Sequence, residues 1–200
     1  MLVVFTIGHS THTLQVFLEL LRAHDIKRVI DVRSIPRSRY NPQFNQKTLS
    51  AKLRSARIGY VRLRKLGGLR HARRDSPNMG WRNTSFRGFA DYMQTPDFEE
   101  GLHRFLKLAK QKKSVLMCAE AVPWRCHRSL IADALVVRHI RVVDIIGKRS
   151  QVHLLTPFAH VQGNYITYPL AVARSSATQS GKKSEVKDIS GLKRGPTASE

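Results

Sequence analysis

Residues 114–128, which read SVLMCAEAVPWRCHR, concentrate chemically competent side chains in one stretch. Two thiols, a carboxylate, an imidazole and two guanidinium groups follow one another closely: Cys118, Glu120, Arg125, Cys126, His127 and Arg128. The apolar run before Cys118 is typical of a buried strand in a parallel sheet, and the apolar spacing from Leu130 onwards is typical of a helix. These side chains therefore occupy a strand-to-helix loop, and the carboxyl end of a strand is where ligands bind in open α/β sheets.

Such a loop supports three kinds of chemistry. A helix N-terminus and neighbouring basic groups would lower the pKa of either thiol and create a thiolate nucleophile. Two thiolates and His127 could instead hold zinc or iron, although Cys-x7-Cys-His is not a standard zinc-knuckle spacing. Glu120 could act as a general acid or base. The structural alternatives are a Cys118–Cys126 disulfide, or buried cysteines with His127 and Arg128 capping the helix.

A second polar turn follows the strand predicted for residues 2–7. It contains His9 and Ser10, and it could present backbone N–H groups to an anion. Leu14, Phe17, Leu18 and Leu21 then recur at helical spacing, so Ser10 or Thr11 is the expected N-cap.

A third polar loop follows the strand predicted for residues 28–33. Arg33, Ser34 and Arg37 make this loop basic and rich in hydroxyl groups, which suits phosphate because guanidinium offers paired donors. A solvated, charged loop is the competing interpretation. Asp31 could orient Arg33 or His9, bind a metal, or cap the loop.

All three polar loops follow strands, so a parallel sheet brings them to the same edge, where they are expected to share one cavity. The predicted catalytic residues are Asp31, Cys118, Glu120, Cys126 and His127. The predicted substrate-binding residues are His9, Ser10, Arg33, Ser34, Arg37, Arg125 and Arg128.

The remaining pattern alternates strands and helices. Helices are expected over 45–57, 86–93 and 97–109, with Thr95 as an N-cap, and further strands over 60–63 and 142–146. This order predicts an α/β fold: one three-layer domain, residues 1–170, with a mostly parallel sheet flanked by helices. Residues 171–200 are polar and basic, and we expect a disordered tail there.

Charge is the strongest compositional feature. Among 200 residues, 35 Lys and Arg stand against 14 Asp and Glu, a formal net charge of +21. Between Arg33 and Arg82 there are 14 basic residues and a single acidic one, Asp75. This field attracts phosphate-rich partners, so an anionic substrate, a nucleotide or a nucleic acid is the expected partner. The alternative is generic surface charge that serves solubility.

Composition also indicates where in the cell the protein is expected. No run approaches the ~18 apolar residues of a membrane helix, and no signal peptide is recognisable. With only two cysteines, a cytoplasmic protein without membrane contact is expected. The oligomeric state is not indicated.

Several ordered motifs resemble one protein family. They are TIGHS at 6–10, DVR at 31–33 with Pro36 and Ser38, LGG at 66–68, MCAE at 117–120, and CHR at 126–128 after Pro123. Together they are similar to the bacterial and archaeal family of domain of unknown function 488, over roughly residues 3–160. The resemblance implies that these positions form one site, and the family name states no activity.

A weaker similarity concerns mechanism. In rhodanese sulfurtransferases and cysteine phosphatases, backbone N–H groups and an arginine surround a thiolate and its anionic substrate. Here the step from Cys118 to Arg125 is longer, and Pro123 would stiffen the loop, so only an analogy follows.

The first hypothesis is therefore an enzyme that acts on a phosphate-bearing substrate, a nucleotide or nucleic acid, through the Cys/Glu/Cys/His/Arg loop. The alternatives are a non-catalytic, basic nucleic-acid-binding module and a protein that binds zinc or iron through its Cys/His cluster.

Overall fold

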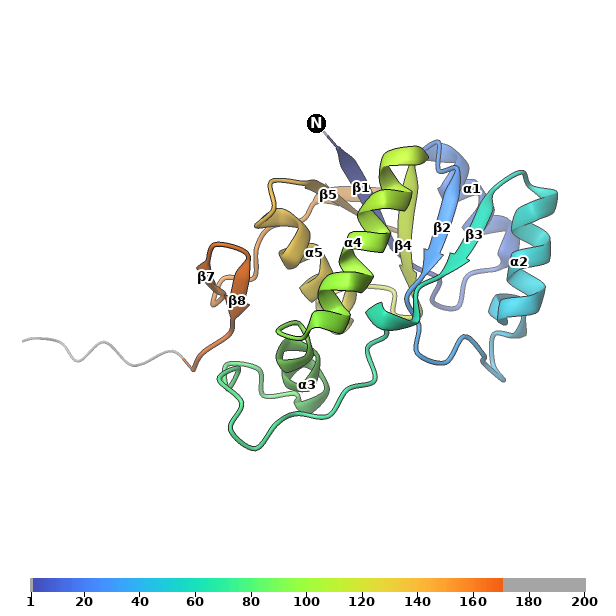
Figure 1. Ribbon diagram of the computed structural model, residues 1–200. Helices are drawn as coiled ribbons and strands as arrows, with labels where there is room; N and C mark the ends of the chain where they lie inside the picture. Colours follow the sequence, from blue (N-terminus) through green and yellow to red (C-terminus); the bar gives the residue numbers. More distant parts are fainter. Residues whose placement is uncertain (1, 171–200) are drawn as a thin grey trace, which may run out of the picture.

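The computed structural model describes residues 2–170 (Figure 1). The predicted disordered tail, residues 171–200, lies outside the described residues. The described part contains five α-helices: α1 Leu14–Ala23, α2 Gln46–Ser55, α3 Thr84–Tyr92, α4 Pro96–Gln111 and α5 Arg128–Val136. Its strands are β1 Val3–Gly8, β2 Arg28–Asp31, β3 Gly59–Arg62, β4 Ser114–Cys118, β5 Arg141–Ile146, β6 Arg149–Val152, β7 His160–Gln162 and β8 Tyr165–Thr167.

Six strands form one sheet in the order β3-β2-β4-β1-β5-β6. The first five are parallel, and β6 pairs antiparallel with β5 across a turn at Gly147, whose φ of 57° suits glycine. Strands β7 and β8 form a separate hairpin. The predicted α/β fold with a mostly parallel sheet is confirmed.

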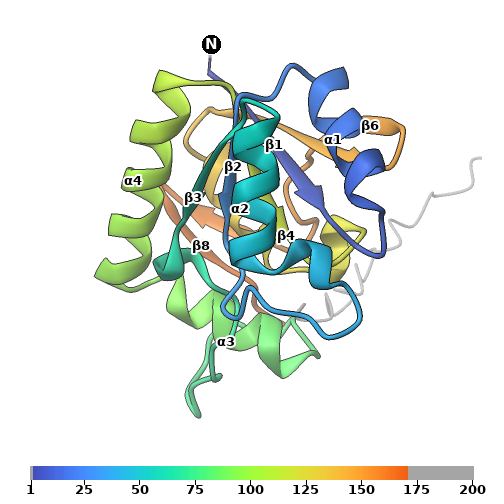
Figure 2. The ribbon, with the colours of Figure 1, turned by 90° about the vertical axis from the view of Figure 1, so that its right-hand side faces the viewer.

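Helices cover both faces of the sheet and make three layers (Figures 1 and 2). Apolar residues of α1 and α2, such as Phe17 and Leu53, pack on one face, and those of α3, α4 and α5, such as Phe89 and Phe105, pack on the other. Strand β4 alternates between the two cores: Val115 and Met117 belong to the first, and Leu116 and Cys118 to the second. This alternation follows from the two-residue period of a strand.

Helix starts follow local capping chemistry. Thr95 caps α4 through the amide of Phe98, as predicted, and Pro96 occupies the first turn. The prediction of Ser10 or Thr11 as the cap of α1 is wrong, because Thr13 accepts the hydrogen bond from the Val16 amide. Ser10 instead belongs to a turn, with a left-handed φ of 47°.

The segment between β3 and α3 has only one 3-10 turn, Arg64–Leu66, and is held by side chains. Trp81 contacts the rings of Phe86, Phe158 and Tyr168. Asp91 of α3 accepts hydrogen bonds from the side chains of Ser76 and Asn78 and from the amide of Arg73. These aromatics therefore anchor the segment to the core, the structural role that aromatic side chains usually have.

Over residues 2–170, no helix has the length and apolar character that crossing a membrane requires.

Candidate functional site

The loops after β1, β2 and β4 emerge side by side at one edge of the sheet. β4 lies between β2 and β1, with Cys118 in register with Gly8 and Met117 in register with Asp31. The chain leaves β1 and β2 towards α1 and α2 on one face, but it leaves β4 towards α5 on the other (Figure 1). Neighbouring strands whose connections run to opposite faces leave a crevice between their loops, and ligands bind there in doubly wound folds.

A pocket of about 420 Å³ opens in this crevice, and we call it the switch-point pocket. Five of the residues predicted from the sequence line it: His9, Ser10, Arg33, Arg37 and Glu120. The other lining residues are Thr11, Ile35, Ser38, Asn41, Ala119 and Ala121. Its volume falls within the range of roughly 300–1,000 Å³ that is usual for small-molecule sites.

Arg33 is the best-fixed cation of the pocket. Its Nε donates to Asp31 Oδ1 (2.9 Å) and its Nη2 to Asp31 Oδ2 (2.6 Å), a paired contact between side chains that are 5% and 0% exposed. Nη2 also donates to the carbonyl of Phe44. Asp31 further accepts the Tyr60 hydroxyl (2.7 Å), and burial together with the Asp31 charge raises the pKa of Tyr60. Asp31 thus positions Arg33 and has no free face towards the pocket.

His9 connects this pair to the first loop. Nη1 of Arg33 lies 3.1 Å from Nε2 of His9, and Nδ1 lies 2.9 Å from the Ser10 carbonyl oxygen. Because guanidinium only donates and a carbonyl only accepts, Nδ1 carries the proton and Nε2 accepts. Burial, aided by the Arg33 charge, lowers the pKa of His9. The neutral ring stacks on Phe44, with centroids 4.2 Å apart.

The open side of the pocket carries exposed charged side chains. Arg37 and Glu120 are exposed at its wall, on the loops after β2 and β4. Ser10 holds its strained left-handed backbone there, fixed by the hydrogen bond from its amide to the Ala119 carbonyl (2.8 Å). Strained backbone of this kind persists only where the surrounding structure enforces it, and it is common at functional sites.

Arg128 fixes the loop that carries Glu120. It is fully buried, and its guanidinium donates to the carbonyl oxygens of Glu120 and Ala121. The loop passes so close to β1 that a Cβ at Gly8 would lie 1.6 Å from the Glu120 carbonyl oxygen. A buried arginine and a glycine therefore set the position of this pocket wall.

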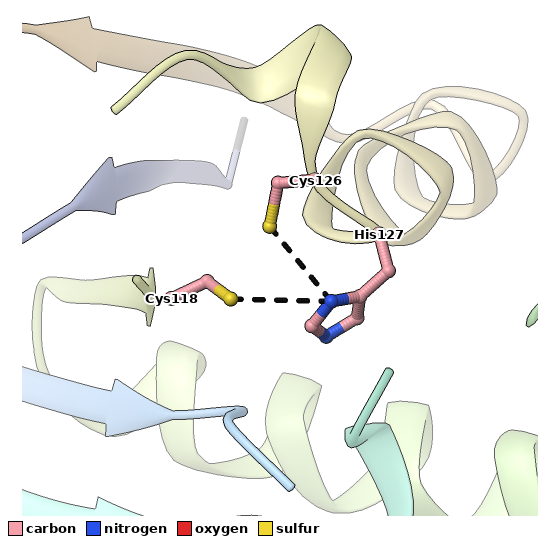
Figure 3. Close-up of side chains that lie close together, drawn as sticks. All are labelled: Cys118, Cys126 and His127. Carbon is pink, nitrogen blue, oxygen red and sulfur yellow. Dashed lines mark hydrogen bonds between the residues drawn. The ribbon is translucent and has the colours of Figure 1, made fainter. Parts of the chain in front are cut away.

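The two cysteines and His127 form a second cluster, on the other face of the sheet (Figure 3). Nδ1 of His127 lies 3.9 Å from Cys118 Sγ and 3.8 Å from Cys126 Sγ, and Nε2 donates to the Leu66 carbonyl (3.1 Å). Both cysteines are buried free thiols, so the disulfide alternative is wrong.

The pKa values of the two thiols are shifted in opposite directions. A hydrogen bond from Cys126, supported by His127, lowers the pKa of Cys118 well below its usual value despite burial. The same hydrogen bond, together with burial and the Cys118 charge, raises the pKa of Cys126 well above its usual value. Of the two cysteines, Cys118 is the one whose ionised form is favoured by its surroundings.

The predicted residues thus meet at one edge of the sheet but divide between its two faces. The cysteines and His127 do not line the switch-point pocket. Ser34 lies outside it as well, where its hydroxyl accepts the amide of Leu69 (2.9 Å). Arg125 is exposed and does not line it either. The cysteine-phosphatase analogy stays a prediction about mechanism, and both sulfurs lie beside the His127 ring.

The structure contains a third polar cluster, which was not predicted from the sequence. His153 lies between two buried carboxylates, with Nδ1 2.8 Å from Asp144 and Nε2 3.0 Å from Asp133. Asp133 also accepts the hydroxyls of Thr156 and Tyr168, and Asp144 accepts that of Thr6. The available signal was a carboxylate inside an apolar run, as in residues 142–146 (VVDII).

This carboxylate cluster borders a larger pocket of about 560 Å³ beside the β4–α5 loop. Its walls include Trp81, Trp124 and Phe158, together with Asp144 and His153. Although burial opposes protonation, hydrogen bonds and charge from Asp133 and Asp144 raise the pKa of His153 to about 9. The cluster ties β5, α5 and the segment leading to β8 together.

A family model described as "Domain of unknown function DUF488" matches residues 13–135. The match covers more than half of the chain and is shorter than the span of the sequence motifs, which begin at Thr6. Neither a search of curated proteins nor a search of solved structures found a match.

Proposed function

This chain belongs to the family of the domain of unknown function DUF488, and we propose that it is an enzyme acting on a phosphate-bearing substrate. The substrate is a nucleotide or a nucleic acid, held in the switch-point pocket. One observation carries the proposal: the loops after β2 and β4 bring two arginines and a carboxylate to the walls of one cavity, to which the loop after β1 adds His9 and Ser10.

Phosphate recognition is assigned to the arginines and the hydroxyls. Arg33 is held in place by Asp31, Phe44 and His9, so its guanidinium loses little entropy when a ligand binds. Arg37 is exposed on the same loop, with Ser38 beside it, and can pair with phosphate oxygens in the paired geometry that guanidinium favours. The basic surroundings raise the local concentration of anions.

Proton transfer is assigned to Glu120. It is a pocket-lining side chain that can give or take a proton, whereas Asp31 is saturated by Arg33 and Tyr60, and Nε2 of His9 is occupied by Arg33. Arg128 and Gly8 hold its backbone. Asp31 and His9 are positioning residues in this scheme.

The proposal is tested by calorimetric titration of the full chain with inorganic phosphate and with adenosine monophosphate. Arg37→Ala should weaken nucleotide binding by about tenfold to a hundredfold, since a hydrogen bond to a charged group contributes about 1.5–3 kcal/mol. Arg39→Ala is the matched control, because it removes the same charge from the same loop without touching the pocket. Equal weakening in both variants would show that the nucleotide does not bind in the switch-point pocket.

Catalysis is tested separately. The chain is incubated with nucleotides and short RNA and DNA oligonucleotides, and the products are identified by mass spectrometry. Glu120→Gln should abolish turnover and leave nucleotide affinity within a few fold, because it removes the proton-transfer group but not the arginines. Turnover that persists in Glu120→Gln would contradict this role, and binding without any turnover would favour a binding module.

A further inference from the structure

The cysteines and His127 form a cluster that the proposed function does not use. Its three candidate donor atoms, two sulfurs and one imidazole nitrogen, all lie within 4.8 Å of one another. They point towards a common centre (Figure 3), and no other His, Cys, Asp or Glu of residues 2–170 joins them in that group. We propose that Cys118, Cys126 and His127 are a zinc site that joins the end of β4 to the start of α5.

The observed spacing is close to that of zinc ligands. With Zn–S near 2.3 Å and Zn–N near 2.0–2.1 Å, tetrahedral geometry places a sulfur and a nitrogen about 3.6 Å apart and two sulfurs about 3.8 Å apart. The sulfur–nitrogen distances here are 3.9 and 3.8 Å. All three donor atoms lie within 4.8 Å of one another, so zinc requires a contraction of a few tenths of an ångström at the imidazole and of up to about 1 Å between the sulfurs.

The imidazole is already oriented as a ligand. Nε2 donates to the Leu66 carbonyl (3.1 Å), so this nitrogen carries the proton and Nδ1 faces the sulfurs with its lone pair available. A hydrogen bond of this kind behind a ligating histidine is the usual outer-shell arrangement at zinc sites. Gly68 packs against the ring so closely that a Cβ there would lie 2.3 Å from Nδ1. Phe89 contacts the ring as well.

Charge and burial favour a soft divalent cation. The thiols are 7% and 3% exposed, and the two thiolates that form when a metal binds would balance the charge of Zn²⁺, which leaves the core without net charge. Thiolate and imidazole donors suit zinc, and Mg²⁺ or Ca²⁺ require oxygen ligands. Three protein ligands leave a fourth position for water or an external ligand.

The site would brace the pocket wall from behind. Cys118 ends β4, and Cys126 and His127 precede α5, so the metal closes the loop that carries Glu120. This inference stands independently of the proposed function, since it requires neither the switch-point pocket nor a substrate.

The test uses the full chain, purified with a reductant and a chelator, then exchanged into metal-free buffer. Titration with Co²⁺ should give tetrahedral d–d bands and sulfur-to-metal charge transfer, saturating near one ion per chain, and Zn²⁺ should displace these bands. Cys118→Ser and Cys126→Ser should lose the charge-transfer band or most of its intensity.

His127→Gln is the sharpest variant, because glutamine can still donate to the Leu66 carbonyl but offers no nitrogen lone pair. Zinc affinity should fall at least tenfold, with the circular dichroism spectrum unchanged. His103→Gln, an exposed change on α4, is the matched control and should bind as the unmodified chain does.

A measurement on the unmodified chain tests the site without the risk that a variant misfolds. Stoichiometric Zn²⁺ should slow alkylation of both thiols in the native chain at least tenfold, and chelator should restore the rate. Unchanged alkylation, absent cobalt charge transfer, or equal zinc affinity in His127→Gln and His103→Gln would each overturn the site.

Discussion

Three arrangements of buried charges in the described part of this protein use partners of opposite charge or carbonyl oxygens, and each holds a different loop. Asp31 and Arg33 order the start of the loop after β2. Arg128 donates to loop carbonyls beside β1. Asp133 and Asp144 hold His153 in the carboxylate cluster. Removing one member of such a group leaves the other buried without compensation, which typically costs 3–5 kcal/mol.

The carboxylate cluster makes stability depend on pH. The pKa of His153 is about 9 in the folded chain against an ordinary value of 6.5. Because the folded value is higher, the stabilisation is complete below pH 6.5 and is lost as the pH rises through 9. The loss amounts to about 3 kcal/mol. Urea unfolding at pH 6 and pH 9.5 should therefore show a lower free energy of unfolding at the higher pH.

His153→Gln provides the control for this dependence, because glutamine forms hydrogen bonds but does not titrate. Other groups, including the thiols and His9, titrate in both proteins, so the difference between the two pH profiles isolates His153. Parallel profiles would contradict the assignment of a protonated His153.

At the scale of elements, the site depends on how closely the β4–α5 loop approaches β1. Gly8 ends β1 in register with Cys118, and the Glu120 carbonyl occupies the space that a side chain at position 8 would need. The loop is thus shaped by a missing side chain on one strand and by Arg128 on the following helix. Substitution at Gly8 should act on the loop, even though Gly8 does not line the pocket.

We expect Gly8→Ala to lower the free energy of unfolding by about 1–3 kcal/mol, the usual cost of overpacking a core. Gly59→Ala is the matched control, since Gly59 also belongs to a strand and a Cβ there would meet only ordinary contacts at 3.6 Å or more. Its stability should be unchanged or slightly higher. Urea unfolding compares the two, and equal effects would show that the loop adapts freely.

At the scale of the whole molecule, the positive charge is concentrated in one segment of the chain. The chain carries +21, and the segment from Arg33 to Arg82 combines 14 basic residues with one acidic residue. This segment includes the loop after β2, which lines the switch-point pocket, together with α2, β3 and almost the whole loop before α3. A long polyanion that enters the pocket would also cross this surface.

Nucleic-acid binding by the full chain should therefore weaken steeply with salt. If about six phosphates are neutralised, affinity should fall roughly a thousandfold between 50 and 200 mM salt. Fluorescence anisotropy with a labelled duplex and a labelled single strand measures this slope. Absence of binding at low salt would restrict the substrate to small anions.

Matched charge variants locate the surface. Replacing Lys47, Lys52 and Arg54 of α2 by glutamine should lower both the affinity and the salt slope. The same change at Arg104, Lys107 and Lys110 of α4 removes equal charge from exposed positions outside the basic segment. Equal losses in the two triple variants would indicate attraction by net charge alone.

Local patterns were sufficient to predict the elements and the edge at which the polar loops meet. Apolar periodicity identified β1, β4, α4 and the buried face of α5. Burial on one side imposes a period of two residues on a strand and of 3.6 residues on a helix, and both periods are visible in the sequence. A parallel sheet then required the loops around His9, Arg33 and Glu120 to share one edge. The N-cap of α1 could not be resolved, since several nearby hydroxyl residues carry the same signal.

Only the tertiary structure decided which of these residues face one another. Insertion of β4 between β2 and β1 sets the register, and the alternation of β4 sends Cys118 to one face while Arg33 and His9 meet on the other. Asp133 and His153 come together from 20 positions apart. Which side chains meet depends on the order and register of strands that are distant in the sequence. The hydrophobic periodicity of one strand shows which of its side chains are buried, but it does not show which strand lies beside it.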